Sequence, residues 1–445
     1  MEIKSLKKYL LNEKSIAPLV VFRIAFGVLM LASITRFIYK GWVHSMYIMP
    51  KVYFPFYGFE WVKPLSPEGM YIVFGLMLVA CVGIILGAFY RLSAVLFFLL
   101  FTYVELIDKT NYLNHYYFIS LVSFLLIFIP AHKSFSIDNI RLKKQDSTSA
   151  PAFYLLLLQL QMFVVYFFAG IAKLNYDWLF EAQPLKIWLP AFSHYPVIGS
   201  FMEKEWVAYL FCWFGCIYDL SIGFFLFNRR TVNIAYVFVI IFHAATALFF
   251  NIGMFPYIMM TITIVFFKEE FHEKIINSLI KITGYKPNST NTAYTPLNPH
   301  LLNFFMLYFV IQFVVPFRYA LYPGKLFWTE QGYRFSWRVM LMEKAGTAFF
   351  FVKDEKSGRE SEVDNKKYLT FLQEKMMATQ PDMMVDYAKF LKEEYKKMGF
   401  TNPTVRAQSY VTLNGSGSRE FINSTIDLSS QSNSFLKNKS WVKSY

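Results

Sequence analysis

The sequence has few of the residues that build disulfide frameworks or metal centres. Three of its 445 residues are cysteine, which is too few for a disulfide-bonded scaffold. Its seven histidines are scattered singly along the chain, without partners at metal-binding spacing. We therefore expect no metal in the function of this protein.

Charged residues are also scarce. They make up 17% of the chain, against 56% hydrophobic and 20% aromatic residues. This balance is too apolar for a water-soluble domain of this size and predicts an integral membrane protein. The net charge of +14 could suit nucleic acid, but the basic residues lie mostly between apolar runs, where they orient membrane spans. We expect no nucleic-acid partner.

Two further features are missing. No small-residue cleavage site follows the first apolar run, so we expect this run to remain as a membrane span and not to be removed as a signal peptide. The sequence also shows no clear internal repeats or paired broken helices, which are the usual signs of a transporter.

Nine apolar runs are long enough, or nearly so, to cross about 30 Å of hydrocarbon. The third, fourth and eighth are short. The nine runs lie near residues 18–39, 70–89, 92–107, 116–131, 152–173, 206–227, 231–250, 252–267 and 301–321. Basic residues concentrate in the segments that share a side with the N-terminus, so we expect a cytoplasmic N-terminus and an outer C-terminal region.

The chain changes character at residue 322, where apolar runs shorten and charges rise. The expected elements there are a hairpin of 349–352 with 360–363, helices at 366–378 and 381–398, and a second hairpin of 406–413 with 420–428. The predicted fold is therefore an all-α polytopic membrane bundle of about eight or nine transmembrane helices, residues 1–321. A small extracytoplasmic α+β domain, residues 322–445, follows it.

Lys173 stands where the fifth apolar run stops. On a helix, Tyr166, Gly170, Lys173 and Asp177 fall on one face. A lysine at such a boundary has two interpretations. It can be an anchor whose ammonium reaches the lipid headgroups. Alternatively, burial can lower its pKa enough to make it a general base near neutral pH.

Other candidate residues lie at the ends of the spans on the same predicted side. Asn114 and His115 begin the fourth span, either as a cap and a structural histidine or as functional groups. His243 lies within a span. Because an imidazole exposed to lipid costs free energy, we expect His243 to face protein or a cavity. The segment 252–256 fits a tight re-entry between spans. The segment 324–338 alternates aromatic residues with arginines, either as an interface anchor or as part of a site.

Four segments, taken in order, resemble the vitamin K-dependent gamma-glutamyl carboxylase family, with its HTTM-type membrane domain. The matching strings are Leu106-Ile107-Asp108-Lys109-Thr110 with Asn114-His115, Val165-Tyr166-Phe167-Phe168-Ala169-Gly170 with Lys173-Leu174 and Asp177-Trp178, Phe242-His243 with Ile252-Gly253-Met254-Phe255, and Trp328-Thr329 with Tyr333 and Ser336-Trp337. The resemblance covers nearly the whole chain. It favours the base interpretation of Lys173 over the anchor interpretation.

The resemblance implies a reaction that removes a proton from an unactivated carbon next to a carboxylate, for which no side chain is basic enough. In the family, a lysine base deprotonates a reduced quinone, which reacts with oxygen. The resulting alkoxide takes the carbon proton, the carbanion adds CO2, and the quinone leaves as an epoxide. The cofactor would be reduced vitamin K or menaquinol, with O2 and CO2 as co-substrates and no metal.

The resemblance also implies roles for the matched residues. Lys173 would be the base, and Asn114 and His115 would orient or polarise the oxygenated quinone, which makes these three the expected catalytic residues. The residues expected to bind the quinone are His243, Gly253, Met254, Phe255, Trp328, Tyr333 and Ser336. The expected partners are a glutamate-containing protein or peptide, a lipid quinone and membrane lipids.

The sequence departs from the animal enzymes at two points. Tyr319 stands where they carry a histidine, and the chain stops at Tyr445, before their β-rich, propeptide-binding region. We therefore expect a short bacterial member in the plasma membrane. The alternatives are a quinol epoxidase without carboxylation, and a non-enzymatic membrane transporter or lipid-binding scaffold.

Overall fold

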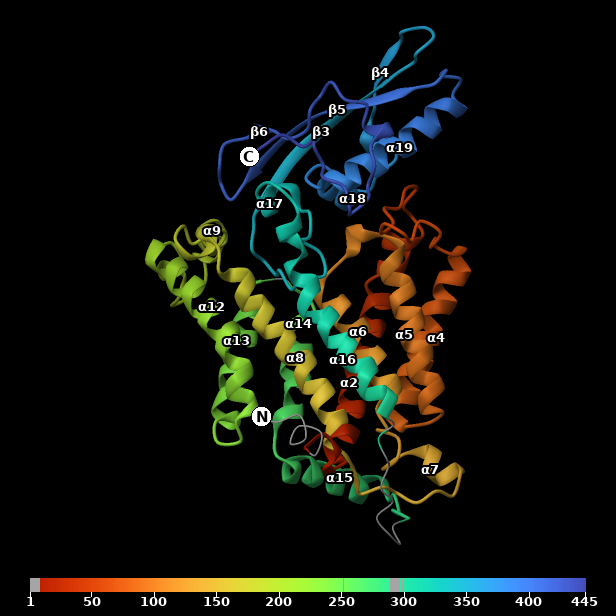
Figure 1. Ribbon diagram of the computed structural model, residues 1–445, viewed down its shortest axis with the longest axis vertical. Coiled ribbons are helices and arrows are strands. Elements are labelled where there is room, and N and C mark those ends of the chain that lie inside the picture. The colour runs from red at the N-terminus through yellow and green to blue at the C-terminus, as the bar shows by residue number, and fades with distance from the viewer. Residues whose placement is uncertain (1–8, 251, 289–296, 298) are drawn as a thin grey trace.

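A bundle of apolar helices carries a small mixed domain on one of its ends (Figure 1). The structure is a computed structural model that describes residues 9–250, 252–288, 297 and 299–445. The apolar helices within these residues are α2 (Ala17–Tyr39), α4 (Pro67–Leu86), α5 (Tyr90–Ile107), α6 (Asn114–Phe128), α8 (Ala152–Lys173), α12 (Glu205–Phe227), α13 (Val232–Phe249), α14 (Phe255–Thr263) and α16 (Pro299–Val314).

Among the described residues, seven helices are long and apolar enough to cross a membrane. The apolar helices α6 and α14 are shorter, and the 3-10 turn η3 (Ile264–Phe266) extends α14. The predicted polytopic helical bundle is confirmed. The run at 92–107, expected to be short, belongs to the 18-residue helix α5.

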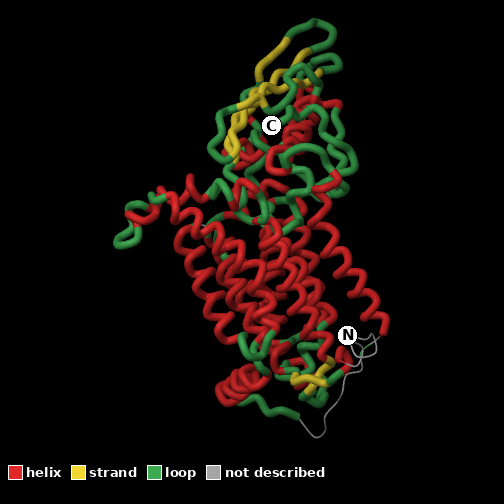
Figure 2. Tube along the Cα trace, turned by 60° about the vertical axis from the view of Figure 1, so that its left-hand side comes forward, coloured by secondary structure: helices red, strands yellow, loops and turns green. Residues whose placement is uncertain are grey.

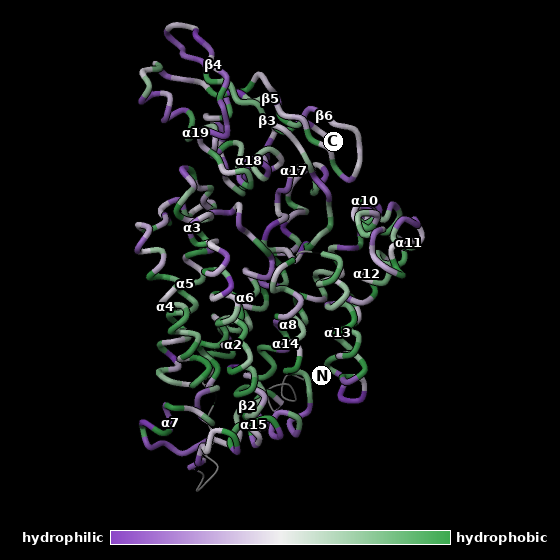
Figure 3. Tube along the Cα trace, turned by 180° about the vertical axis from the view of Figure 1, so that it is seen from behind, coloured by the Kyte–Doolittle hydropathy of each residue, from purple (hydrophilic) through white to green (hydrophobic). Residues whose placement is uncertain are grey.

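Large apolar side chains cover the outside of the bundle. On α16, Met306, Leu307, Val310 and Val314 are more than half exposed. Figure 3 shows the hydrophobic colour along the bundle and hydrophilic segments at its two ends. Such a surface fits lipid as solvent, because a helix satisfies its own backbone hydrogen bonds and needs only apolar side chains outside.

Short elements connect these helices at both ends of the bundle. They are β1 (Glu13–Ser15), α3 (Trp42–Tyr47), η1 (Lys109–Asn111), α7 (Ile137–Arg141), β2 (Ser149–Pro151), α9 (Tyr176–Leu179), α10 (Leu185–Trp188), η2 (Leu189–Phe192), α11 (Gly199–Met202), α15 (Glu269–Thr283), η4 (Val315–Leu321) and α17 (Leu326–Thr329). Figure 1 shows α7 and α15 at the end opposite the small domain, and α9 and α17 at the end near it. The tube view of Figure 2 shows the helices of the bundle running side by side between these two ends.

The small domain contains a four-stranded antiparallel sheet. The strand order is β4 (Glu360–Glu362), β3 (Lys344–Lys353), β5 (Thr404–Leu413) and β6 (Arg419–Glu420). The long central pair aligns Lys344 with Leu413 and Lys353 with Thr404. Helices α18 (Phe371–Met377) and α19 (Pro381–Lys397) complete the domain, with the 3-10 turns η5 (Asn365–Lys367) and η6 (Leu428–Ser430). The predicted α+β character of this region is confirmed.

Two predicted elements of this domain are shorter in the structure. The helix expected from residue 366 begins at Phe371, because Thr370 and Gln373 form a reciprocal capping box there. The second hairpin is formed, but β6 is only two residues long and η6 begins at Leu428. The first hairpin, in which Phe351 pairs with Glu362, and the helix at 381–397 lie where they were predicted.

Candidate functional site

Lys173 is buried inside the bundle and has a carboxylate partner. Its Nζ atom donates to Asp219 Oδ2 at 2.5 Å and to the carbonyl of Ala169 at 3.4 Å. The side chains of Lys173 and Asp219 are 8% and 5% exposed. The anchor interpretation is therefore wrong for this structure, since the ammonium does not reach the surface. The apolar run predicted a lysine in apolar surroundings, without a carboxylate partner.

Close packing of two helices makes this ion pair possible. Gly170, one turn before Lys173 on α8, faces α12, and a Cβ there would lie 2.6 Å from the backbone nitrogen of Leu220. Gly215, one turn before Asp219 on α12, leaves space beside the Lys173 side chain. Only residues without a side chain allow backbones to approach this closely.

The helix face that was predicted to carry Lys173 and Asp177 together does not extend beyond Lys173. Helix α8 stops there, and Asp177 lies in the separate turn α9. Asp177 accepts a hydrogen bond from Asn414 at 2.8 Å and pairs with Lys325 at 3.0 Å. Asp177 therefore ties the membrane bundle to the small domain and is not placed beside the Lys173 amine.

A second polar group lies on the same side of the bundle interior. The hydroxyl of Tyr166 is 3.2 Å from His243 Nε2 and 3.3 Å from Thr263 Oγ1. The other ring nitrogen of His243, Nδ1, is buried and has no partner among the described residues. A buried polar atom without a partner costs free energy, so His243 Nδ1 is a candidate contact for a bound molecule.

Asn114 and His115 reach the site at the start of α6. Asn114 Nδ2 donates to the carbonyl of Arg338 at 2.8 Å, which ties α6 to the segment that follows α17. The ring of Phe255 lies between two imidazoles, with its centroid 5.7 Å from that of His115 and 5.7 Å from that of His243. The turn before α14, where Gly253 has a φ of 63°, thus places Phe255 in the middle of the site.

Two adjoining hollows surround these residues. The inner pocket, of about 110 Å³, is lined by Tyr166, Lys173, Trp178, Asp219, Phe242, His243 and Trp337, among others. The outer cavity, of about 870 Å³, is lined by His115, Met254, Gly253 and Tyr333 and by several charged side chains. The two share a wall formed by Asn114, Phe250, Ile252, Phe255, Val339 and Met340. The outer cavity has the size of a small-molecule site.

Basic side chains dominate the charges around the outer cavity. Arg36, Lys109, Arg334 and Arg338 line it, and Glu330 is the one carboxylate among the described residues of its wall. Lys109 and Arg334 are already paired with carboxylates. Arg338 is 6% exposed, its guanidinium lies 4.4 Å from the Tyr319 ring, and its Nε has no hydrogen-bond partner among the described residues. Arg338 is thus a buried cation in the cavity wall that has no carboxylate partner in the part of the chain that the structure describes.

Two of the expected quinone-binding residues lie outside both hollows. Trp328 is buried in the small domain, where its Nε1 donates to the carbonyl of Lys443 and its ring packs against Phe421. Ser336 donates to the carbonyl of Tyr333 and closes a backbone turn. Their positions do not support a contact with quinone. The tryptophan of the segment 324–338 that lines the inner pocket is Trp337, not Trp328.

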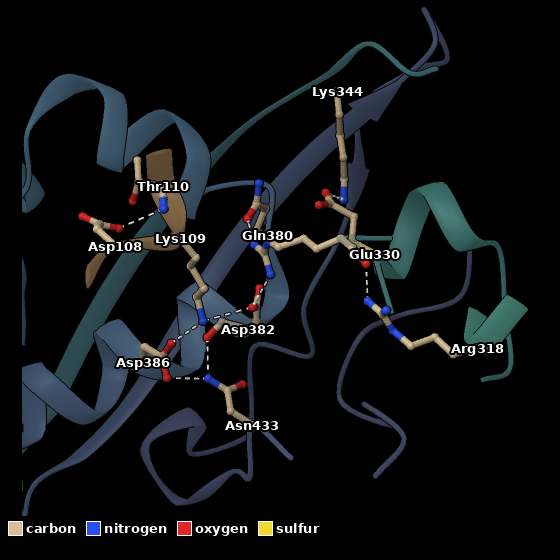
Figure 4. A network of polar contacts seen from close by, with 11 residues as sticks. Asp108, Lys109, Thr110, Arg318, Glu330, Lys344, Gln380, Asp382, Asp386 and Asn433 are labelled. Atoms are coloured by element: carbon tan, nitrogen blue, oxygen red, sulfur yellow. Dashed lines mark hydrogen bonds and ion pairs between the residues drawn. The ribbon is translucent and has the colours of Figure 1, made fainter. Parts of the chain in front are cut away.

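A network of ion pairs attaches the small domain to the bundle next to the outer cavity (Figure 4). Lys109, from η1, lies 3.0 Å from Asp382 and 2.6 Å from Asp386, both on α19. Arg334 pairs with Asp382 at 2.7 Å. Burial opposes the charge of Asp382, but Arg334 and Lys109 outweigh it and hold the pKa of Asp382 well below its usual value. The ion pair at Asp382 therefore remains charged at neutral pH.

Asp219 is a candidate functional residue that was not predicted from the sequence, although a signal was present. It is an acid inside the apolar run 206–227. Ionisable residues in membrane spans face protein or a cavity and are functional candidates by default. Arg338 was noticed in its aromatic segment, but its position in the cavity depends on the fold of the segment around it.

The fold and the site together define a polytopic helical membrane protein with a buried lysine–carboxylate pair beneath a cationic cavity. Residues 12–271 match the HTTM domain family. Residues 297–445 match the family described as vitamin K-dependent gamma-carboxylase, lumenal domain. No solved structure matches the chain. The chain belongs to the gamma-glutamyl carboxylase family, which implies an enzyme of that type with vitamin K hydroquinone as cofactor and glutamate-containing substrates.

Proposed function

We propose that this protein couples the epoxidation of a hydroquinone to the γ-carboxylation of protein glutamate, with Lys173 as the base that starts the reaction. The observation that carries the proposal is the buried pair of Lys173 and Asp219 in the wall of the inner pocket. A buried amine in a pocket is suited to proton transfer, because it can be held in one position and shielded from water.

The lining of the inner pocket fits a quinone ring. Trp178, Phe242, Phe250, Phe255 and Trp337 supply flat apolar surfaces. The unpartnered Nδ1 of His243 offers a polar contact at the edge of such a ring. When bound, the hydroquinone supplies, by its reaction with oxygen, the strong base that no side chain provides.

The residues of the chain then have separate tasks. For Lys173 to act as a base, its Nζ has to be a neutral amine, with the proton of the Lys173–Asp219 pair on Asp219 Oδ2. Nζ then receives the proton that leaves the hydroquinone. Asn114 positions the segment around Arg338 against α6. His115 and His243, on the two sides of Phe255, orient the bound ring. The aromatic walls keep water away from the amine.

The outer cavity is the proposed site of the glutamate side chain. Arg338 is buried without a carboxylate partner among the described residues, and Arg36 lines the same cavity. An arginine guanidinium matches the geometry of a carboxylate. We place the small domain and this cavity on the extracytoplasmic side of a bacterial plasma membrane, because basic residues concentrate at the other end of the bundle.

The test uses the purified full chain in nanodiscs, with vitamin K hydroquinone or menaquinol, oxygen, labelled bicarbonate and a glutamate-rich peptide. Epoxide and peptide-bound label are measured separately. Both products together support the proposal. Epoxide without label identifies a quinol epoxidase, since Lys173 serves the first step of both reactions. Absence of both products with each quinone contradicts the proposal and favours a transporter or lipid-binding scaffold.

A further inference from the structure

A separate hollow lies at the end of the bundle opposite the small domain, far from the inner pocket and the outer cavity. It has a volume of about 560 Å³ and is formed by the first turn of α5 and by the segment 132–147, which includes α7. We call it the basal pocket. Figure 1 shows α7 beside the lower ends of the apolar helices, where a membrane surface would lie. Nothing in the proposed reaction uses this pocket.

Positive charge dominates the basal pocket. Within the part of the chain that the structure describes, its lining includes the basic residues Arg91, Lys133, Arg141 and Lys144, and the single carboxylate of Asp138. Among the described residues, no carboxylate lies within ion-pairing distance of Arg91 or Lys144. Burial lowers the pKa of Lys133, and the charges of Arg91 and Lys144 lower it further. The basic groups are therefore close enough to repel one another.

The carboxylate of Asp138 already has hydrogen-bond and ion-pair partners in the wall of the pocket. Asp138 accepts hydrogen bonds from the backbone N–H groups of Phe89 and Tyr90, both at 2.9 Å, and so caps the start of α5. It also pairs with Arg141 at 3.2 Å. Asp138 therefore organises the wall of the pocket and pairs with Arg141, not with Arg91 or Lys144.

The wall is held in place before any ligand binds. Arg23, buried in α2, donates to the carbonyl groups of Ala131 and Phe135 at 3.0 and 2.7 Å. Asp146 accepts hydrogen bonds from the N–H of Phe135 and from the side chain of Asn139. A binding site with a fixed wall loses little conformational entropy when its ligand arrives.

Exposed apolar side chains surround the basic lining. Phe89, Leu92 and Ile140 are 56%, 64% and 61% exposed, and Phe89 and Leu92 also line the pocket. Leu92 belongs to the first turn of a membrane helix. The combination of an anion-binding hollow with a lipid-facing apolar border has the chemistry of a phospholipid, whose phosphate and acyl chains meet at this depth.

We propose that the basal pocket binds the phosphate-bearing headgroup of an anionic glycerophospholipid, with Arg91, Lys133 and Lys144 around the phosphate and the acyl chains along Leu92 and Phe89. Lysine and arginine are the usual partners of phosphate. A zwitterionic lipid carries a compensating ammonium group, so the positive charges of Arg91 and Lys144 favour a lipid with a net negative charge.

The test is a titration of the purified full chain with dioleoyl phosphatidylglycerol in phosphatidylcholine-containing micelles, with retained lipid counted by native mass spectrometry. The wild type is expected to retain one phosphatidylglycerol with an apparent affinity at least tenfold above that for phosphatidylcholine. The double variant Arg91→Gln/Lys144→Gln is expected to lose this preference. Raising the salt concentration is expected to weaken binding, since such attraction is screened.

A matched control is the double variant Lys274→Gln/Lys281→Gln, which removes two exposed positive charges from α15 at the same end of the bundle. It is expected to retain phosphatidylglycerol within about twofold of the wild type. The single variant Lys144→Gln, at an exposed position, serves if the first variant does not fold. Equal retention of the two lipids by the wild type would overturn the proposal, as would unchanged retention by the Arg91 and Lys144 variants. Complete displacement of the lipid by millimolar inorganic phosphate would assign the pocket to a soluble phosphate instead.

Discussion

Lys173 Nζ and Asp219 Oδ2 lie 2.5 Å apart in the interior of the membrane bundle, on helices α8 and α12. A buried ion pair is costly to form, because both groups lose their water. It is retained where geometry or function needs it. Here the pair lies in the wall of the inner pocket, so its position connects the packing of two helices with the chemistry that we propose.

Asp219→Asn is expected to lower the rate of epoxide formation by about ten- to a hundredfold. Asparagine keeps the shape of the side chain but removes the charge that holds the Lys173 amine. Because Asp219 acts through Lys173, the variant should also shift the pH–rate profile along the pH axis. Simple loss of folded protein would instead lower the rate by the same factor at every pH. Ser221→Ala, which removes a hydroxyl bonded within the same helix, is the control, and a wild-type pH profile for Asp219→Asn would argue against the role of Asp219.

Gly170→Ala is expected to destabilise the bundle by about 1–3 kcal/mol and to reduce activity. The new methyl group would lie 2.6 Å from the backbone nitrogen of Leu220 and push α8 away from α12. Gly75→Ala, on α4, is the matched control, because a Cβ there has no neighbour within 4 Å. Thermal unfolding in detergent measures both variants. Equal unfolding temperatures for the two would contradict the close-packing argument.

Arg338→Gln is expected to raise the KM for the glutamate peptide by about ten- to a hundredfold, as for the loss of one hydrogen bond to a charged group. Epoxide formation at saturating peptide should change little, since Arg338 lines the outer cavity and not the inner pocket. Arg359→Gln, at an exposed position of the small domain, provides the control. An unchanged KM would remove Arg338 from the peptide site.

Lys109→Met is expected to weaken the attachment of the small domain to the bundle. It leaves Asp382 and Asp386 with one fewer cation, and loss of one partner of a buried ion pair costs about 3–5 kcal/mol. Limited proteolysis between the bundle and the small domain should be faster in this variant. Lys396→Gln, which breaks an exposed pair with Glu393, should leave proteolysis unchanged, and equal rates for the two variants would contradict the docking role of Lys109.

The sequence predicts where helices and strands lie along the chain better than it predicts which of them pack together. Long apolar runs mark the spans, because a membrane helix needs only apolar length. The two hairpins of the small domain were predicted from local turns, but the central pairing of β3 with β5 was not, because it joins strands separated by α18 and α19. Pairing between distant segments depends on packing that no local pattern records.

The candidate site shows the same division. Lys173, Asn114, His115 and His243 were found from sequence, and the structure places all four around the two adjoining hollows. Asp219 was missed because its relation to Lys173 depends on how α8 and α12 pack. Trp328 was assigned to the quinone pocket from a matching string, yet its side chain packs within the small domain. A short matching stretch of sequence identifies a segment of the fold, but it does not show toward which part of the structure each side chain points.

The most direct test of the account compares epoxide formation by Lys173→Ala with that of the wild type, in nanodiscs that contain equal amounts of folded protein. A general base contributes about 10²- to 10⁴-fold to a rate. The account predicts a loss of that size, with the unfolding temperature showing that the variant still folds. Epoxide formation within about twofold of the wild type would contradict the assignment of Lys173 as the base.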